Sequence, residues 1–81
     1  MEYIATFFSH FGSVRFKKIC DKKGVQAKIM PVPRNLSSSC GTCVKFSGES
    51  WDFYGDVTDE LEQIVQICDN DYKLLFKAED S

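Results

Sequence analysis

The chain has 81 residues, of which 43% are hydrophobic and 27% charged, and its formal net charge is −2. This length fits one small domain, covering residues 1–81, that buries roughly 60–65% of the surface of its unfolded chain. A weakly acidic chain without a basic cluster gives no electrostatic reason to bind nucleic acid. No apolar run approaches the roughly 18 residues of a membrane span, and no signal peptide is visible. We therefore expect a cytoplasmic protein that binds no membrane.

The first half of the chain predicts a strand, a helix and a second strand. Residues 2–8 are rich in β-branched and aromatic side chains, which favours a strand. Ser9 is a suitable N-cap for a helix over residues 10–23, and Gly24 is a suitable C-terminal stop. Residues 25–30 alternate between apolar and polar, which predicts a half-buried strand.

The second half predicts a strand, a helix and a last strand. Residues 42–46 alternate, with Thr42, Val44 and Phe46 on one face. Residues 51–55 fit either a helical turn or an aromatic flap. The clearest helical stripe in the chain then follows at spacings of three and four residues, on Val57, Leu61, Ile64, Val65 and Cys68. Residues 72–77 predict a final strand.

This order of elements, β-α-β-β-α-β, predicts an α+β fold of the ferredoxin-like type. Such a fold has a four-stranded antiparallel sheet with both helices on one face, which leaves the other face open. Some of six residues are expected there: Ile4, Thr6, Phe8, Lys28, Lys45 and Leu75. Apolar groups on an open face would mark a surface for a homodimer or a partner protein. The alternative is that residues 51–54 cover part of it.

The segment 30–43 has the composition of a functional loop. It holds both prolines, three consecutive serines and two of the four cysteines. Hydroxyl donors and cations lower the pKa of a thiol, so Ser37, Ser38, Ser39 and Arg34 could form a cradle for a Cys40 thiolate. Gly41 would let a substrate atom approach closely. The alternative is a flexible polar turn in which Cys40 only begins a strand.

Cys40 and Cys43 also form a Cys-x-x-Cys pair, which has three interpretations. A thioredoxin-type redox pair normally begins a helix after the first strand, whereas this pair precedes a strand at mid-chain. A structural zinc site needs four ligands, and the remaining candidates are unpaired, so we expect no metal. The third interpretation makes Cys40 the working thiol and Cys43 a core residue or a resolving thiol. His10, the only histidine, is expected at the start of the helix as a surface group.

The loop resembles a known family at this point. The match is carried by Phe7-Phe8-Ser9, by Gly24-Val25, and above all by Met30-Pro-Val-Pro-Arg-Asn-Leu-Ser-Ser-Ser-Cys40-Gly41. These motifs are similar to those of the bacterial selenium/sulfur carrier-like family, a short domain of otherwise unknown function. The resemblance implies a carrier that accepts sulfur or selenium on Cys40, as a persulfide or selenosulfide. It also implies a desulfurase-type donor protein and an acceptor protein.

Three hypotheses about function follow, and one of them is a thiol–disulfide oxidoreductase that uses Cys40 and Cys43. The first is a small carrier with a reactive Cys40 and no cofactor, rather than an enzyme that turns over substrate. The alternative is a non-catalytic interaction or regulatory module that dimerises or docks through an open sheet face.

Overall fold

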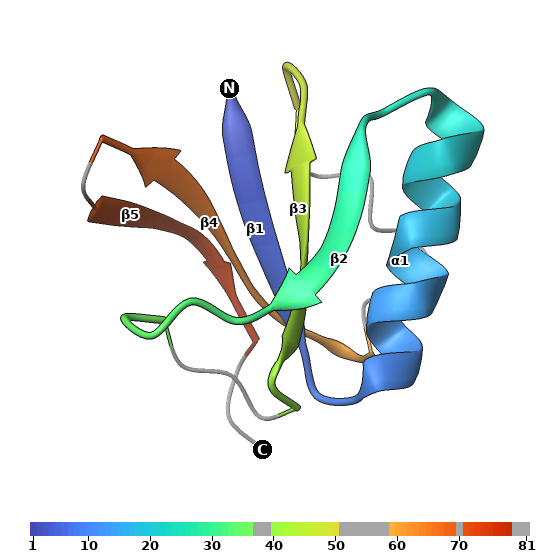
Figure 1. The fold of residues 1–81 in the computed structure, drawn as a ribbon, viewed down its shortest axis with the longest axis horizontal. Helices are drawn as coiled ribbons and strands as arrows, with labels where there is room; N and C mark the ends of the chain where they lie inside the picture. Colours follow the sequence, from blue (N-terminus) through green and yellow to red (C-terminus); the bar gives the residue numbers. More distant parts are fainter. Residues whose placement is uncertain (37–39, 51–58, 70, 79–81) are drawn as a thin grey trace.

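A computed structural model describes residues 1–36, 40–50, 59–69 and 71–78 of the protein. Within these residues one helix packs on a five-stranded antiparallel sheet with strand order β2-β3-β1-β4-β5 (Figure 1). The elements are β1 (Glu2–Phe7), α1 (His10–Lys23), β2 (Ala27–Pro31), β3 (Thr42–Ser47), β4 (Leu61–Cys68) and β5 (Asp71–Lys77). The α+β class is therefore correct, whereas the predicted four strands and two helices are not.

Local signals correctly placed the first helix. The Ser9 side chain accepts a hydrogen bond from the backbone N–H of Gly12, as an N-cap residue does. Gly24 ends the helix with φ 74°, a left-handed conformation that glycine adopts without strain. Lys22 and Lys23 lie in the last turn, where positive charge complements the helix dipole. Consequently α1 has the predicted bounds.

The predicted second helix is wrong, because residues 61–68 form strand β4. In the register with β1, Thr6 pairs with Gln63 but Phe7 pairs with Leu61, so β4 carries one extra residue at this point. This bulge brings Leu61 and Ile64 onto the same face of the sheet, although they are three residues apart. Val65 is buried on the opposite face, because β4 lies between β1 and β5. A bulged strand buried on both faces thus imitates the spacing of an amphipathic helix. The first residue of the predicted stripe, Val57, and the ambiguous segment 51–55 lie outside the described residues.

The main core lies between α1 and the sheet. Phe16 of α1 stands between two strands, with ring centroids 5.4 Å from Phe7 and 5.2 Å from Phe46. Tyr3 stacks on Phe46 at 5.3 Å. Edge-on and offset aromatic contacts at such distances are favourable beyond their buried area. Val25, Ala27 and Ile29 line this core, as the alternation of residues 25–30 predicted.

The other face of the sheet is less open than predicted. Ile4, Cys43 and Val65 form a second buried cluster there, with exposed fractions of 0–2%. Val32 and Leu36, from the loop after β2, pack against this cluster. In Figure 1 the same loop crosses the strands at their lower ends. Leu75, expected on the open face, instead packs on the α1 side, since a register shift between Ile64 and Val65 offsets β5. The loop therefore packs on part of the face that the sequence predicted to be open.

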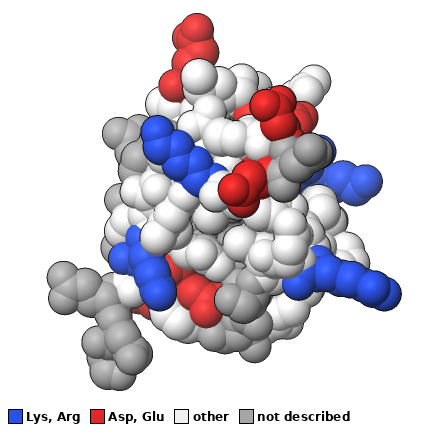
Figure 2. Space-filling view, turned by 90° about the vertical axis from the view of Figure 1, so that its left-hand side faces the viewer, with Lys and Arg blue, Asp and Glu red and all other residues white. Residues whose placement is uncertain are grey.

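Charged side chains are dispersed over the face on the β4–β5 side. Figure 2 shows both positively and negatively charged side chains on this face, among uncharged residues. This view is consistent with the small net charge. In the part of the chain that the structure describes, no helix is both long and apolar enough to cross a bilayer.

Candidate functional site

The loop after β2 returns to the sheet at Cys40 and Gly41. A backbone hydrogen bond of 3.1 Å, from the Val32 N–H to the Gly41 carbonyl, continues the β2–β3 ladder by one step. Gly41 has φ 79°, which favours glycine. A Cβ atom at Gly41 would meet no described atom within 4 Å. Within the described structure, glycine is needed there for backbone conformation rather than for space.

Cys40 lies at this turn with its sulfur directed at Thr42. The Cys40 Sγ atom is 3.2 Å from Thr42 Oγ1 and 3.4 Å from the Thr42 carbonyl oxygen. Cys40 is half-buried, so a reagent can approach a sulfur that already has polar neighbours. A thiolate at this position would accept a hydrogen bond from the Thr42 hydroxyl.

Thr42 joins Cys40 to the first turn of α1. Its Oγ1 atom lies 3.4 Å from His10 Nδ1 and 3.4 Å from Ser13 Oγ. Ser13 is fully buried, whereas His10 is exposed. His10 was predicted as a surface residue, and Thr42 and Ser13 were not proposed as site residues. One signal was available: Thr42 is a polar residue at a position predicted to face the helix.

Cys43 lies on the face of the sheet opposite Thr42. It is 0% exposed, belongs to the second cluster, and its sulfur is 3.8 Å from the Pro31 carbonyl oxygen. Burial, and to a smaller extent the neighbouring Cys40, raise the pKa of Cys43 to about 11. Cys43 is thus a protonated thiol at neutral pH. Both Cys40 and Cys43 are free thiols.

The other two cysteines differ from Cys40 in their surroundings. Cys20 is fully buried in the main core, and burial, followed by the charge of Asp21, raises its pKa to about 11. Cys68 is half-buried at the end of β4. Among the described residues, the thiol of Cys40 is the one that has a hydroxyl within 3.2 Å.

The remaining predicted site residues are only partly described. Arg34 is exposed in the turn after Pro33, and it makes no hydrogen bond or ion pair with another described residue. Ser37, Ser38 and Ser39 lie outside the described residues. The cradle predicted from these four residues therefore stays a prediction.

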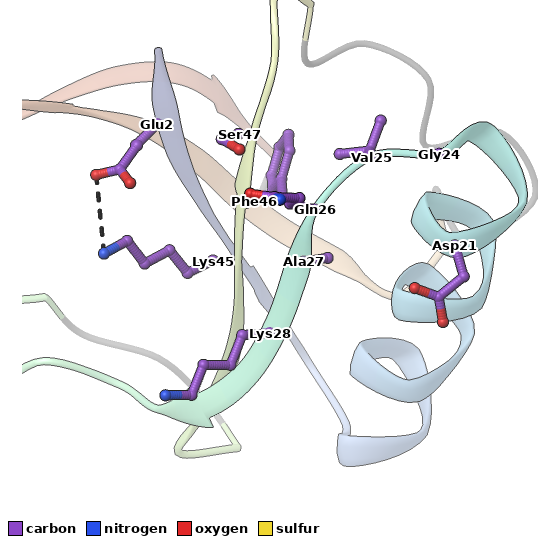
Figure 3. Close-up of a pocket in the computed structure, with 10 residues that line it drawn as sticks. All are labelled: Glu2, Asp21, Gly24, Val25, Gln26, Ala27, Lys28, Lys45, Phe46 and Ser47. Atoms are coloured by element: carbon purple, nitrogen blue, oxygen red, sulfur yellow. Dashed lines mark ion pairs between the residues drawn. The ribbon is translucent and has the colours of Figure 1, made fainter.

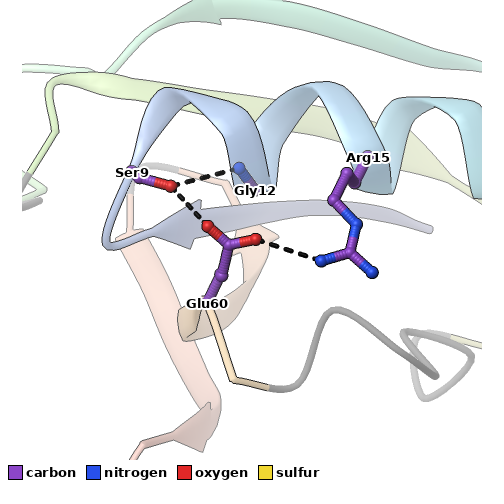
Figure 4. A network of polar contacts seen from close by, with 4 residues as sticks. All are labelled: Ser9, Gly12, Arg15 and Glu60. Atoms are coloured by element: carbon purple, nitrogen blue, oxygen red, sulfur yellow. Dashed lines mark hydrogen bonds and ion pairs between the residues drawn. The ribbon is translucent and has the colours of Figure 1, made fainter.

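A polar network holds the first turn of α1 at the sheet (Figure 4). The Ser9 hydroxyl donates to Glu60 Oε1 at 2.5 Å, and Arg15 binds Glu60 Oε2 at 3.2 Å. Glu60 directly precedes β4, so the network ties the start of the helix to the start of that strand. Gly12 makes this approach possible, because a Cβ atom there would lie 2.9 Å from the Cβ of Glu60. The network therefore helps to position His10 and Ser13 near Thr42.

A pocket lies at the other end of the β2–β3 pair (Figure 3). Its lining runs over the turn between α1 and β2 and includes Lys28, Lys45 and Glu2. Lys45 is 3.7 Å from Glu2, which offsets part of the positive charge. Lys45, the residue of this pocket nearest to Thr42 along β3, stands three positions away, which is about 10 Å along a strand. The pocket is consequently separate from the Cys40 site.

Fold and site together define a small α+β domain that presents a cysteine where a helix start, a loop and a strand meet. The chain belongs to the family described as "Putative Se/S carrier protein-like", whose model matches residues 2–75. This match confirms the family that the Pro-Val-Pro-Arg and Ser-Ser-Ser-Cys-Gly motifs indicated. No curated protein and no solved structure matches the chain.

Proposed function

We propose that the protein carries a sulfur or selenium atom on Cys40, as a persulfide or selenosulfide. The observation that carries the proposal is the placement of the Cys40 sulfur. It is half-buried and lies 3.2 Å from the Thr42 hydroxyl, at the point where α1 begins. The family description supports a carrier role, and the buried positions of Cys20 and Cys43 favour Cys40 as the reactive thiol.

The proposed loading step is an exchange between a thiol and a persulfide. The Cys40 thiolate attacks the outer sulfur of a donor persulfide, and a bond forms between Cys40 Sγ and that sulfur. The sulfur–sulfur bond within the donor breaks, and the donor leaves as a thiolate that takes up the proton Cys40 has lost. One thiol and one persulfide give one persulfide and one thiol, so no external oxidant or reductant is needed.

The same exchange chemistry defines which reactive groups the donor and the acceptor must present. The donor must present a persulfide, or the corresponding selenium species, on an accessible side chain, as a desulfurase-type protein does. The acceptor must supply a nucleophile that attacks the outer atom on Cys40. Neither step requires a metal or an organic cofactor on this chain.

Cys43 serves this carrier better as a core residue than as a resolving thiol. A resolving thiol attacks as a thiolate, whereas burial holds the pKa of Cys43 near 11. A Cys40–Cys43 disulfide would also require the buried Cys43 sulfur to leave its cluster on the far face. We therefore expect the cargo to stay on Cys40 until an acceptor arrives.

Intact-protein mass spectrometry tests the proposal. The protein is incubated with a desulfurase and either cysteine or selenocysteine, and then separated from small molecules. The wild-type chain should gain one sulfur or selenium atom, and Cys68→Ser should gain the same mass, whereas Cys40→Ser should gain none. An unchanged wild-type mass, or an equal gain on Cys40→Ser, would overturn the proposal.

A further inference from the structure

The hydroxyl of Thr42 has three polar neighbours from two elements. Cys40 Sγ lies 3.2 Å away, and His10 Nδ1 and Ser13 Oγ each lie 3.4 Å away. A hydroxyl has one proton to donate and two lone pairs to accept. Thr42 can therefore satisfy all three neighbours at once, but only if it donates to one of them and accepts from the other two.

Two proton arrangements meet this condition with Ser13 as a donor. In the first, the Cys40 thiol donates to Thr42, and Thr42 donates to the unprotonated Nδ1 of His10. In the second, Nδ1–H of a protonated His10 donates to Thr42, and Thr42 donates to a Cys40 thiolate. The three contacts of the Thr42 hydroxyl are kept in both arrangements, so the change between them requires no movement of the Thr42 side chain. The contact of Cys40 Sγ with the Thr42 carbonyl oxygen is a hydrogen bond only while the thiol holds its proton.

We propose that Thr42 relays the proton of the Cys40 thiol to His10 Nδ1. One proton passes from sulfur to the Thr42 oxygen while the hydroxyl proton of Thr42 passes to Nδ1. Cys40 becomes a thiolate, His10 becomes an imidazolium, and Thr42 remains a neutral alcohol. Ser13 keeps Thr42 oriented by its own hydrogen bond. This inference rests on the proposed function, because the thiolate is the form of Cys40 that accepts sulfur.

The position of His10 suits this role. It is exposed, so the imidazolium formed is solvated, and bulk water can later take up its proton. Its ring is held by the first turn of α1, which the Ser9–Glu60–Arg15 network attaches to β4.

The rate of Cys40 alkylation measures the relay without any sulfur donor. Wild type and variants react with iodoacetamide at about pH 7.5, and peptide mapping follows Cys40. An ordinary thiol, with a pKa of about 8.5, is already about one-tenth ionised at this pH, so the relay can raise the rate by at most about tenfold. We expect His10→Ala and Thr42→Val to slow the reaction about three- to tenfold, within that limit. Thr42→Ser keeps the hydroxyl and should remain within about twofold.

Two comparisons separate proton transfer from a merely structural role. Added imidazole should restore the rate of His10→Ala but not that of Thr42→Val, because Thr42→Val lacks the hydroxyl that passes the proton. Lys18→Ala, an exposed change on the same helix, should react like wild type. The inference is overturned if His10→Ala alkylates as fast as wild type, if imidazole leaves its rate unchanged, or if Thr42→Ser is as slow as Thr42→Val.

The loading assay distinguishes failure of this inference from failure of the carrier function. If the relay is correct, His10→Ala should load to the same final extent as wild type, only more slowly. If the wild-type protein never gains sulfur or selenium but the alkylation rate of Cys40 still depends on His10, the carrier function is refuted and the proton relay is not. Full loading with a rate independent of His10 would refute the relay and leave the carrier.

Discussion

Replacement of Gly12 by alanine should destabilise the protein although alanine is the better helix former. Alanine in place of glycine inside a helix is worth up to about 1 kcal/mol. The added Cβ atom, however, would lie 2.9 Å from the Cβ of Glu60 and 3.2 Å from both the Cβ and a ring carbon of Phe7. The two Cβ atoms are bonded directly to the backbone, of Phe7 in β1 and of Glu60 just before β4, so α1 itself must move.

The magnitude follows from the two opposing effects. Overpacking of this kind costs about 1–3 kcal/mol, which exceeds the gain in helix propensity. With a cost of about 2 kcal/mol, the middle of that range, and a propensity gain of up to about 1 kcal/mol, we expect a net loss of about 1–2 kcal/mol in the free energy of unfolding. For a chain of this size, that corresponds to a fall of about 5–15 °C in Tm.

Thermal and urea unfolding, followed by circular dichroism, measure this loss. Gly48→Ala is the matched control, because its Cβ would have Ser50 O, at 3.9 Å, as its nearest neighbour and its φ is not positive. That variant should lie within about 0.5 kcal/mol of wild type. A Gly12→Ala protein as stable as wild type, or more stable, would refute the close approach of α1 to Glu60.

Three further predictions concern the site and its supports. Gly41→Ala should lower the free energy of unfolding by about 1–2 kcal/mol, because a non-glycine residue is strained at φ 79°. Urea unfolding measures this loss, and an unchanged midpoint would contradict the prediction. Burial raises the pKa of Cys20 and of Cys43 from 9.0 to about 11, so their contribution to stability is complete below pH 9 and is lost as pH rises from 9 to 11. This contribution is no more than about 2–3 kcal/mol for each thiol. Cys20→Ala should therefore make the free energy of unfolding fall less steeply between pH 9 and 11. An unaltered slope would argue against the raised pKa of Cys20. Ser9→Ala and Glu60→Gln should each lower the free energy of unfolding by about 0.5–1.5 kcal/mol. The double variant should lose less than the sum of the two, because the two side chains share one hydrogen bond. Strictly additive losses would count against the network.

The first half of the fold could be predicted because its signals are local. Ser9 and Gly24 mark the ends of α1 through their own side-chain and backbone preferences. The alternation of residues 25–30 and 42–46 correctly assigned the helix-facing side of β2 and β3. β4 could not be predicted in this way. Its apparent helical stripe arises from a bulge opposite Thr6 and Phe7 and from burial on both faces, and both depend on strands distant in the sequence.

The sequence by itself determined the family, the loop and the candidate cysteine. Cys40 stands in a motif whose residues are adjacent in the chain, so a linear pattern was sufficient to find it. Only the tertiary structure decided what surrounds the thiol. Thr42 meets His10 and Ser13 across about thirty residues of chain, because the start of α1 packs beside the start of β3. Such contacts depend on how the helix docks on the sheet, which no local pattern records.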